Sequence, residues 1–92
     1  MHFKYSEHAK LKLREREIQE HEVEEILRKP REILLDIETG NLIMVGDRKS
    51  KQNHKLIVVY SQEKDKVITI IDTSKTEIIK KRKEIGRWVK VK

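Results

Sequence analysis

The chain has 92 residues, no cysteine and a formal net charge of +6, and 41% of its residues are charged. This length fits one domain, residues 1–92, and the lack of cysteine excludes disulfides, zinc–thiolate sites and thiol catalysis. The apolar runs are too short to span a membrane and no signal-peptide pattern opens the chain, so we expect a cytoplasmic protein with no membrane partner. So small a domain buries little surface, which favours a stiffening sheet or oligomerisation.

The net charge is concentrated at one end of the chain. Residues 75–92 carry eight Lys and Arg against two Glu, whereas residues 1–74 carry 14 basic and 14 acidic side chains. A neutral globule with a basic segment indicates a polyanionic partner, most simply the phosphates of RNA. The abundance of Lys, Glu and Ile is also typical of thermophile proteins, in which most charges form a solvated surface.

The first third of the chain predicts a short strand and two helices. Apolar residues alternate over Phe3–Tyr5, which favours a leading strand. Ser6 is a suitable cap for a helix over Glu7–Arg16. A second helix follows a cap at Gln19, where flanking apolar residues form a hydrophobic staple, and it ends at Pro30.

After this proline the apolar pattern becomes extended and predicts four strands. Their ranges are Glu32–Glu38, Leu42–Gly46, His54–Ser61 and Lys66–Asp72. Short turns join most of them, so they are expected to form an antiparallel meander, with a mobile polar loop over residues 47–53. The last two strands are apolar on both faces, which predicts a central position in the sheet under the helices.

The basic segment also has a structural pattern. The run Ser74-Lys75-Thr76-Glu77 matches a capping box, so we expect a helix that reaches Ile85 and ends at Gly86. Residues 87–92 alternate again and favour a final short strand. The predicted fold class is therefore α+β: two N-terminal helices packed on an antiparallel four-stranded β-meander, followed by a basic C-terminal helix and strand within residues 75–92.

No motif for a metal or a nucleotide cofactor is present. The histidines have no metal-ligand spacing, and neither a glycine-rich phosphate loop nor a nucleophile elbow occurs. We therefore expect no metal site and no cofactor. What remains is the chemistry of a metal-free nuclease, in which side chains move protons and fixed cations hold phosphate.

Five residues are candidate catalytic groups for that chemistry: His8, Arg14, Arg16, Tyr60 and Arg87. His8 falls in the first turn of a predicted helix, beside free N–H groups that favour phosphate. Only one of Arg14 and Arg16 can point the same way, because residues two apart differ by about 200° around a helix. Each also has a structural explanation: an exposed histidine, surface ion pairs, or a packed tyrosine.

A second set of residues is predicted to contact nucleic acid. These cations lie in the polar loop and in the predicted last helix: Arg48, Lys49, Lys51, Lys80, Lys81, Arg82 and Lys83. A solvated hairpin tip explains the loop cations as well. Trp88, the sole tryptophan, either stacks on a base or anchors the C-terminal segment to the core.

The order of these residues resembles a known family, domain of unknown function 4258. The likeness is carried by Phe3-x-x-Ser6-Glu7-His8-Ala9, by Arg14-Glu15-Arg16, and by Ile18, Val23, Leu27 and Pro30. The strand pattern of residues 56–60 and 67–72 and the closing Gly86-Arg87-Trp88 are also similar. Members typically have a glycine where this chain has Glu17, and a Ser or Thr cap where it has Gln19.

The resemblance implies helices packed on an antiparallel sheet and a relation to the RelE/ParE-type toxin fold, whose best-known members cleave mRNA on the ribosome. Its motif supports His8 and one of Arg14 or Arg16 as functional groups. The resulting hypothesis is a metal-independent endoribonuclease toxin that acts on RNA or the ribosome and is neutralised by an antitoxin protein. The alternatives are a nucleic-acid-binding module without catalysis and a partner-binding protein.

Overall fold

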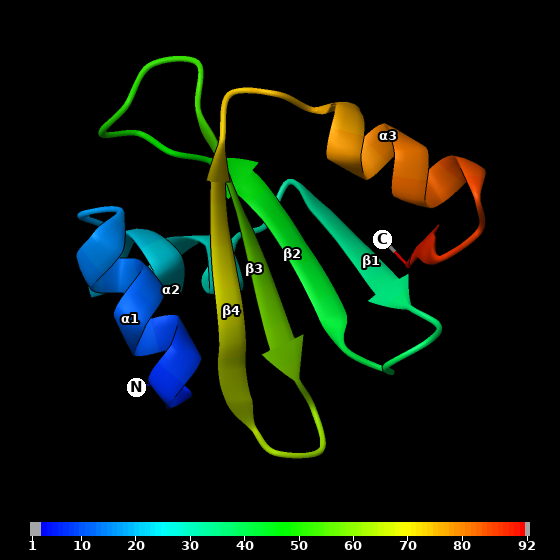
Figure 1. Cartoon of the computed structure of the whole chain (residues 1–92), viewed down its shortest axis with the longest axis horizontal. Coiled ribbons are helices and arrows are strands. Elements are labelled where there is room, and N and C mark those ends of the chain that lie inside the picture. The colour runs from blue at the N-terminus through cyan, green and yellow to red at the C-terminus, as the bar shows by residue number, and fades with distance from the viewer. Residues whose placement is uncertain (1–2, 92) are drawn as a thin grey trace.

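The computed structural model describes residues 3–91, which form three helices and one five-stranded antiparallel sheet (Figure 1). The helices are α1 (Glu7–Glu15), α2 (Glu20–Arg28) and α3 (Glu77–Glu84). The strands are β1 (Glu32–Asp36), β2 (Leu42–Asp47), β3 (Lys55–Ser61), β4 (Lys66–Thr73) and β5 (Trp88–Lys90). The predicted α+β class is confirmed, whereas the predicted sheet of four strands lacked β5.

The strand order in the sheet is β4-β3-β2-β1-β5. The first four strands form the expected meander, and β5 returns to pair antiparallel with β1, so that Trp88 lies opposite Asp36. The prediction that β4 is central is therefore wrong, because β4 lies at one edge of the sheet. The expected leading strand is reduced to a bridge in which Tyr5 pairs with Val67 of β4.

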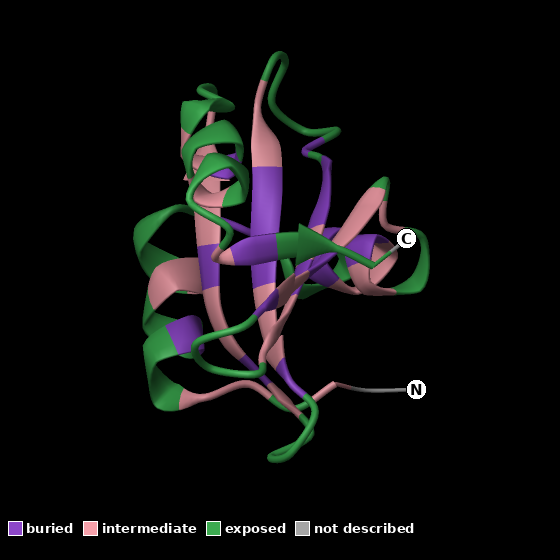
Figure 2. Ribbon diagram, turned by 90° about the vertical axis from the view of Figure 1, so that its right-hand side faces the viewer, coloured by how far each residue is buried: buried purple, intermediate pink, exposed green. Residues whose placement is uncertain are grey.

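Helices cover both faces of the sheet because the apolar side chains of β3 alternate. Leu56 and Val58 point into a core with α1 and α2, while Ile57 points into a second core with α3 and β5. Figure 2 shows the buried residues along the strands between these layers. The prediction that β3 is buried on both faces is confirmed, since all three of these residues are fully buried.

The helix starts follow the local sequence in two of three cases. Ser6 caps α1: its Oγ accepts a hydrogen bond from the Ala9 amide at 3.0 Å, as predicted. At α2, the Glu22 carboxylate accepts a hydrogen bond from the Gln19 amide at 2.9 Å. The predicted capping box at Ser74 does not form, because the cap of α3 is Thr76, without a side-chain cap bond.

Candidate nucleic-acid interface

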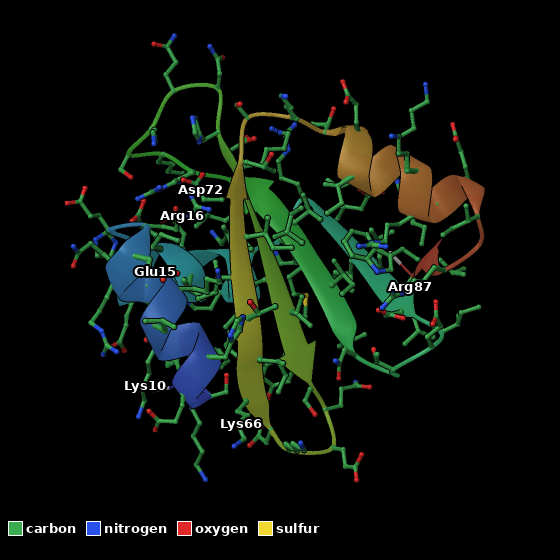
Figure 3. All side chains as sticks on the ribbon, viewed as in Figure 1. Lys10, Glu15, Arg16, Lys66, Asp72 and Arg87 are labelled. Carbon is green, nitrogen blue, oxygen red and sulfur yellow. The ribbon has the colours of Figure 1, made fainter. Side chains whose placement is uncertain are left out.

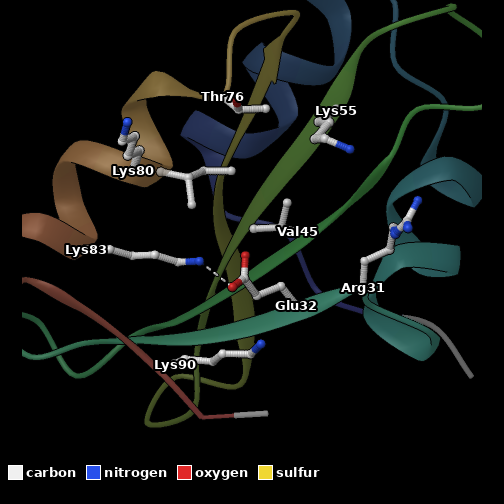
Figure 4. A pocket seen from close by; sticks show the side chains of 9 residues that line it. Arg31, Glu32, Val45, Lys55, Thr76, Lys80, Lys83 and Lys90 are labelled. Carbon is white, nitrogen blue, oxygen red and sulfur yellow. Dashed lines mark hydrogen bonds and ion pairs between the residues drawn. The ribbon is translucent and has the colours of Figure 1, made fainter.

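A basic groove lies between α3 and the sheet (Figure 4). Its volume is about 500 Å³. Five cations and one carboxylate line it, together with three uncharged residues: Arg31, Lys55, Lys80, Lys83, Lys90, Glu32, Val45, Thr76 and Ile79. We call these nine residues the α3 groove.

Packing of α3 on the sheet directs these cations into one place. Ile79 is buried in the second core, which fixes the orientation of α3 on the sheet. Lys80 follows Ile79 in the chain, Lys83 lies about one helical turn after Ile79, and both line the groove. Lys55 begins β3 and Lys90 ends β5. The predicted basic helix therefore supplies two cations, and the remaining three come from the sheet and from the segment before β1.

Ion pairs neutralise only part of this charge. Lys83 Nζ donates to Glu32 Oε2 at 2.5 Å, while Lys55 and Arg31 both donate to Asp47, at 2.6 and 2.5 Å. Those hydrogen bonds, led by the one from Lys55, hold the pKa of Asp47 below its usual range. Lys80 and Lys90 form no ion pair within residues 3–91, so the groove keeps positive charge to offer to an anion.

The other predicted cations of α3 face a different surface. Lys81 and Arg82 line a second cavity of about 590 Å³ with apolar walls from β4 and α3: Ile71, Ile78 and Ile85. The Arg82 guanidinium carbon lies 5.5 Å from the centroid of the Trp88 ring. The basic segment is thus divided between two sides of α3.

Trp88 anchors the C-terminal strand and is not free to stack on a base. Its side chain belongs to the second core and the residue is 5% exposed. Its indole N–H donates to Asp36 Oδ2 at 3.4 Å. Of the two roles considered for this tryptophan, the structure supports anchoring. The prediction that Trp88 stacks on a base is corrected, because the ring is buried in the core.

Arg48 is also a structural residue, contrary to its predicted role as a phosphate contact on a solvated loop. Its side chain is 5% exposed and bonds to Asp72 at 2.7 Å and to Glu22 at 3.3 Å. It further donates to the Glu17 carbonyl at 2.9 Å. These bonds, together with one to the Arg16 carbonyl, fix the loop between β2 and β3 against the first two helices and hold the guanidinium away from solvent. Lys49, which pairs with Glu25, and Lys51 remain exposed.

The cluster around Arg48 favours the ionised form of Glu22. Burial alone would raise the pKa of Glu22, but hydrogen bonds from Ser50 Oγ, the Gln19 amide and Arg48 together hold it below its usual range. An unpaired charge at this depth would be costly, so the cluster is stable only as a set.

The five predicted catalytic residues do not come together. His8, Arg14 and Arg16 lie exposed on or at the end of α1, which covers β4, while Arg87 precedes β5. Those strands are the two edges of the sheet, four strand spacings or about 19 Å apart. Figure 3 shows Arg16 and Arg87 on opposite sides of the molecule.

Two of these residues are committed to local contacts. Arg87 pairs with Asp36 and Glu38, each at 3.2 Å; the hydrogen bond to Asp36 is the main reason why its pKa is raised. The Tyr60 hydroxyl donates to Asp65 in the β3–β4 turn, which raises the pKa of the tyrosine. Each of these two side chains therefore already has a protein partner with which a phosphate would have to compete.

Sequence reasoning missed His54 and Asp72 as partners. Neither residue was a candidate site residue, yet Asp72 Oδ1 lies 2.8 Å from His54 Nδ1 and Asp72 Oδ2 accepts from Arg48. The pairing of β3 with β4 could have indicated this contact, because in that register Leu56 lies opposite Asp72 and both residues of the pair are then at the same end of the hairpin. That pairing places two polar side chains at the rim of an apolar hairpin.

Within residues 3–91 no three His, Asp or Glu side chains gather as metal ligands. None of the helices there has the length and apolar character required to cross a bilayer.

The fold and groove define a small α+β protein with a basic cleft beside its last helix. Residues 5–72 match the family described as Domain of unknown function (DUF4258), and the chain belongs to that family. The match covers the first two helices and the four-stranded meander, whereas α3 and β5 follow it. No curated protein and no solved structure matches the chain.

Proposed function

We propose that this protein binds RNA in the α3 groove and cleaves it as a metal-independent endoribonuclease of the RelE/ParE-like toxin type. The observation that carries the proposal is the gathering of five cations around one carboxylate in a groove of about 500 Å³. Helices packed on an antiparallel sheet are also what the toxin resemblance implies, which supports the superfamily assignment.

The groove has the chemistry of a phosphate-binding surface. Lys80 and Lys90 are exposed and form no ion pair within residues 3–91, so their ammonium groups can meet phosphate without first losing a protein partner. Arg31 and Lys55 share the single carboxylate of Asp47 and so retain excess positive charge. A row of such cations binds a nucleic-acid backbone without reading its sequence.

Neutralising the unpaired groove cations tests RNA binding. We expect Lys80→Gln/Lys90→Gln to weaken single-stranded RNA binding about tenfold and to reduce the salt slope of the binding constant by about 1.4, because each phosphate contact contributes about 0.7. Fluorescence anisotropy of a labelled RNA between 50 and 200 mM salt measures both quantities. The matched control is Lys4→Gln/Lys64→Gln, which removes the same charge from exposed residues outside the groove.

An unchanged slope in the groove variant, or an equal change in the control, would refute the groove as the RNA site. Cleavage is followed separately, by primer extension on mRNA in a translating extract and on free RNA with EDTA. RNA binding without cuts in either reaction would favour the binding module over the nuclease. Failure to bind RNA at any salt concentration would leave the partner-binding alternative.

A toxin of this kind requires an antitoxin, and the second cavity beside α3 suits one. Its walls are the isoleucines of β4 and α3, and its rim carries Lys75, Lys81 and Arg82. An acidic amphipathic segment would bury its apolar side against the isoleucines and pair its carboxylates with the rim. Co-expression with the product of a neighbouring small gene, scored by recovery of growth, checks this part of the proposal.

A further inference from the structure

The histidine before β3 and the aspartate near the end of β4 form an oriented pair. His54 Nδ1 lies 2.8 Å from Asp72 Oδ1. The aspartate side chain is 5% exposed, whereas the histidine side chain is 23% exposed and reaches solvent. A buried carboxylate thus holds one ring nitrogen of a histidine whose other edge is accessible.

The Arg48 cluster fixes the aspartate in turn. Arg48 Nη1 donates to Asp72 Oδ2 at 2.7 Å, so the two oxygens of this carboxylate have separate partners. Arg48 itself is held by Glu22 and by the carbonyl groups of Arg16 and Glu17. The carboxylate can therefore neither rotate nor leave without breaking a buried set of bonds.

This arrangement sets the tautomer of His54. Its Nδ1 faces Asp72 Oδ1, a carboxylate oxygen that can only accept, so this nitrogen carries the hydrogen and donates it to Asp72. Nε2 is then the basic nitrogen, and within residues 3–91 it has no hydrogen-bond partner. A base oriented by a third group is the general pattern of activation in metal-free hydrolysis and transfer.

The histidine lines a cavity that adjoins the α3 groove. The cavity has a volume of about 480 Å³ and is also lined by Lys55 and Ser74. Lys55 lines the groove too, and Thr76 of the groove is two residues, or at most about 7 Å, from Ser74. An RNA strand held in the groove therefore has a short path to His54.

We propose that His54, oriented by Asp72, is the general base that cleaves RNA bound in the α3 groove; this inference rests on the proposed function. Nε2 takes the proton of a ribose 2′-hydroxyl, and the 2′ oxygen forms a bond to the adjacent phosphorus. The bond from phosphorus to the 5′ oxygen breaks, and that oxygen takes a proton from water. The products are a 2′,3′-cyclic phosphate and a 5′-hydroxyl, and the imidazolium returns its proton to solvent.

Replacing the base should abolish cleavage and leave binding intact. We expect His54→Ala to lower the cleavage rate about 100-fold or more, with an unchanged dissociation constant for RNA. The assay uses the full chain and whichever substrate the wild type cuts, with liquid chromatography and mass spectrometry to identify the cyclic phosphate. His21→Ala, an exposed histidine on α2, is the matched control and should cut at the wild-type rate.

A second measurement separates a chemical role from a structural one. Imidazole in the buffer should restore part of the activity of His54→Ala, because it can enter the vacated space and accept the same proton. A merely structural histidine would give a variant with a lower melting temperature and no rescue. An RNA with a single 2′-deoxyribose at the cut site should resist cleavage by the wild type.

The outcomes distinguish this proposal from the proposed function. Cleavage that persists in His54→Ala, or that is lost in His8→Ala instead, overturns the assignment of the base while the nuclease function stands. RNA binding without any cleavage by the wild type overturns the base and leaves binding in the groove. Loss of cleavage with imidazole rescue and intact binding supports both.

Discussion

At the scale of single residues, Glu17 occupies a position whose backbone conformation favours glycine. α1 ends in a Schellman motif, in which the Ile18 amide donates to the Leu13 carbonyl and the Glu17 amide to the Arg14 carbonyl. The motif requires a left-handed residue, and Glu17 has φ of 53°. Its carbonyl also accepts a hydrogen bond from Arg48. A glycine would adopt this conformation without strain.

We therefore expect Glu17→Gly to stabilise the protein. Relief of the left-handed conformation is worth about 1–2 kcal/mol, and the added freedom of glycine in the unfolded chain offsets about half of it. The net gain of about 0.5–1 kcal/mol corresponds to a melting temperature raised by about 4 °C. Thermal unfolding by circular dichroism measures it.

A neighbouring helical position serves as the control for that substitution. Glu15→Gly, in the last turn of α1, should lower stability by about 1 kcal/mol, because there glycine only loosens a helix. If both variants were destabilised alike, the left-handed strain at Glu17 would not be a real cost.

At the scale of elements, one glycine decides how closely α2 approaches the sheet. A Cβ on Gly46 of β2 would lie 2.8 Å from Ile26 Cγ1 and 3.3 Å from its Cγ2. Ile26 is buried in the first core, and its side chain is stiff because it branches at Cβ, so these two atoms cannot move away easily. A larger residue at this position would push the helix away from β2.

Gly46→Ala is therefore expected to lower the free energy of unfolding by about 1–3 kcal/mol, as overpacking does. Urea denaturation measures the loss. The same substitution in an Ile26→Ala background should cost much less, because the clashing Cγ1 and Cγ2 atoms are gone. Additive effects of the two substitutions would show that the close approach is not the cause.

The end of α3 lies where the sequence predicted it, but its start does not. α3 ends where Gly86 was expected to stop it, through a second Schellman motif with φ of 76° at the glycine. Its start was misjudged, because Thr73 Oγ1 accepts from the Lys75 amide in a local turn that delays the helix until after Thr76. Side-chain hydrogen bonds in such turns compete directly with a capping box.

At the scale of the whole molecule, buried carboxylates link distant segments. Glu22 joins α2 to the loop before β3, and Asp36 joins the end of β1 to Arg87 and Trp88 near the C-terminus. Burial alone would raise the pKa of Asp36, but hydrogen bonds from Arg87 and from the Glu38 and Thr39 amides hold it below its usual range. Both carboxyl groups therefore have lowered pKa values in the folded protein.

Lowered pKa values make the fold sensitive to acid. The stability that such carboxylates contribute is complete above their unfolded pKa values, about 4.3 for Glu and 3.9 for Asp, and is lost as the pH falls through the lower folded values. We expect the urea midpoint to be constant from pH 7 to about pH 5 and to fall below about pH 4. Glu22→Gln should flatten part of this dependence. A midpoint that rose on acidification would contradict the assigned direction.

The sequence determined most of the local structure of this protein. Ser6 capped α1, Pro30 followed the end of α2, Gly86 ended α3, and apolar alternation identified the strands, because these signals act between residues a few positions apart. The basic character of α3 could likewise be predicted without knowing what surrounds the helix. Charge in a segment is a property of composition and does not depend on packing.

The tertiary structure decided what those elements do together. It placed β5 beside β1, put α3 on the face opposite α1, and buried Arg48 between Glu22 and Asp72, residues 26 and 24 positions away. The predicted site residues were separated by the sheet, and His54 was oriented by an aspartate 18 positions away. Contacts at such separations depend on how the apolar faces of all elements pack at once, so no local pattern in the sequence specifies them.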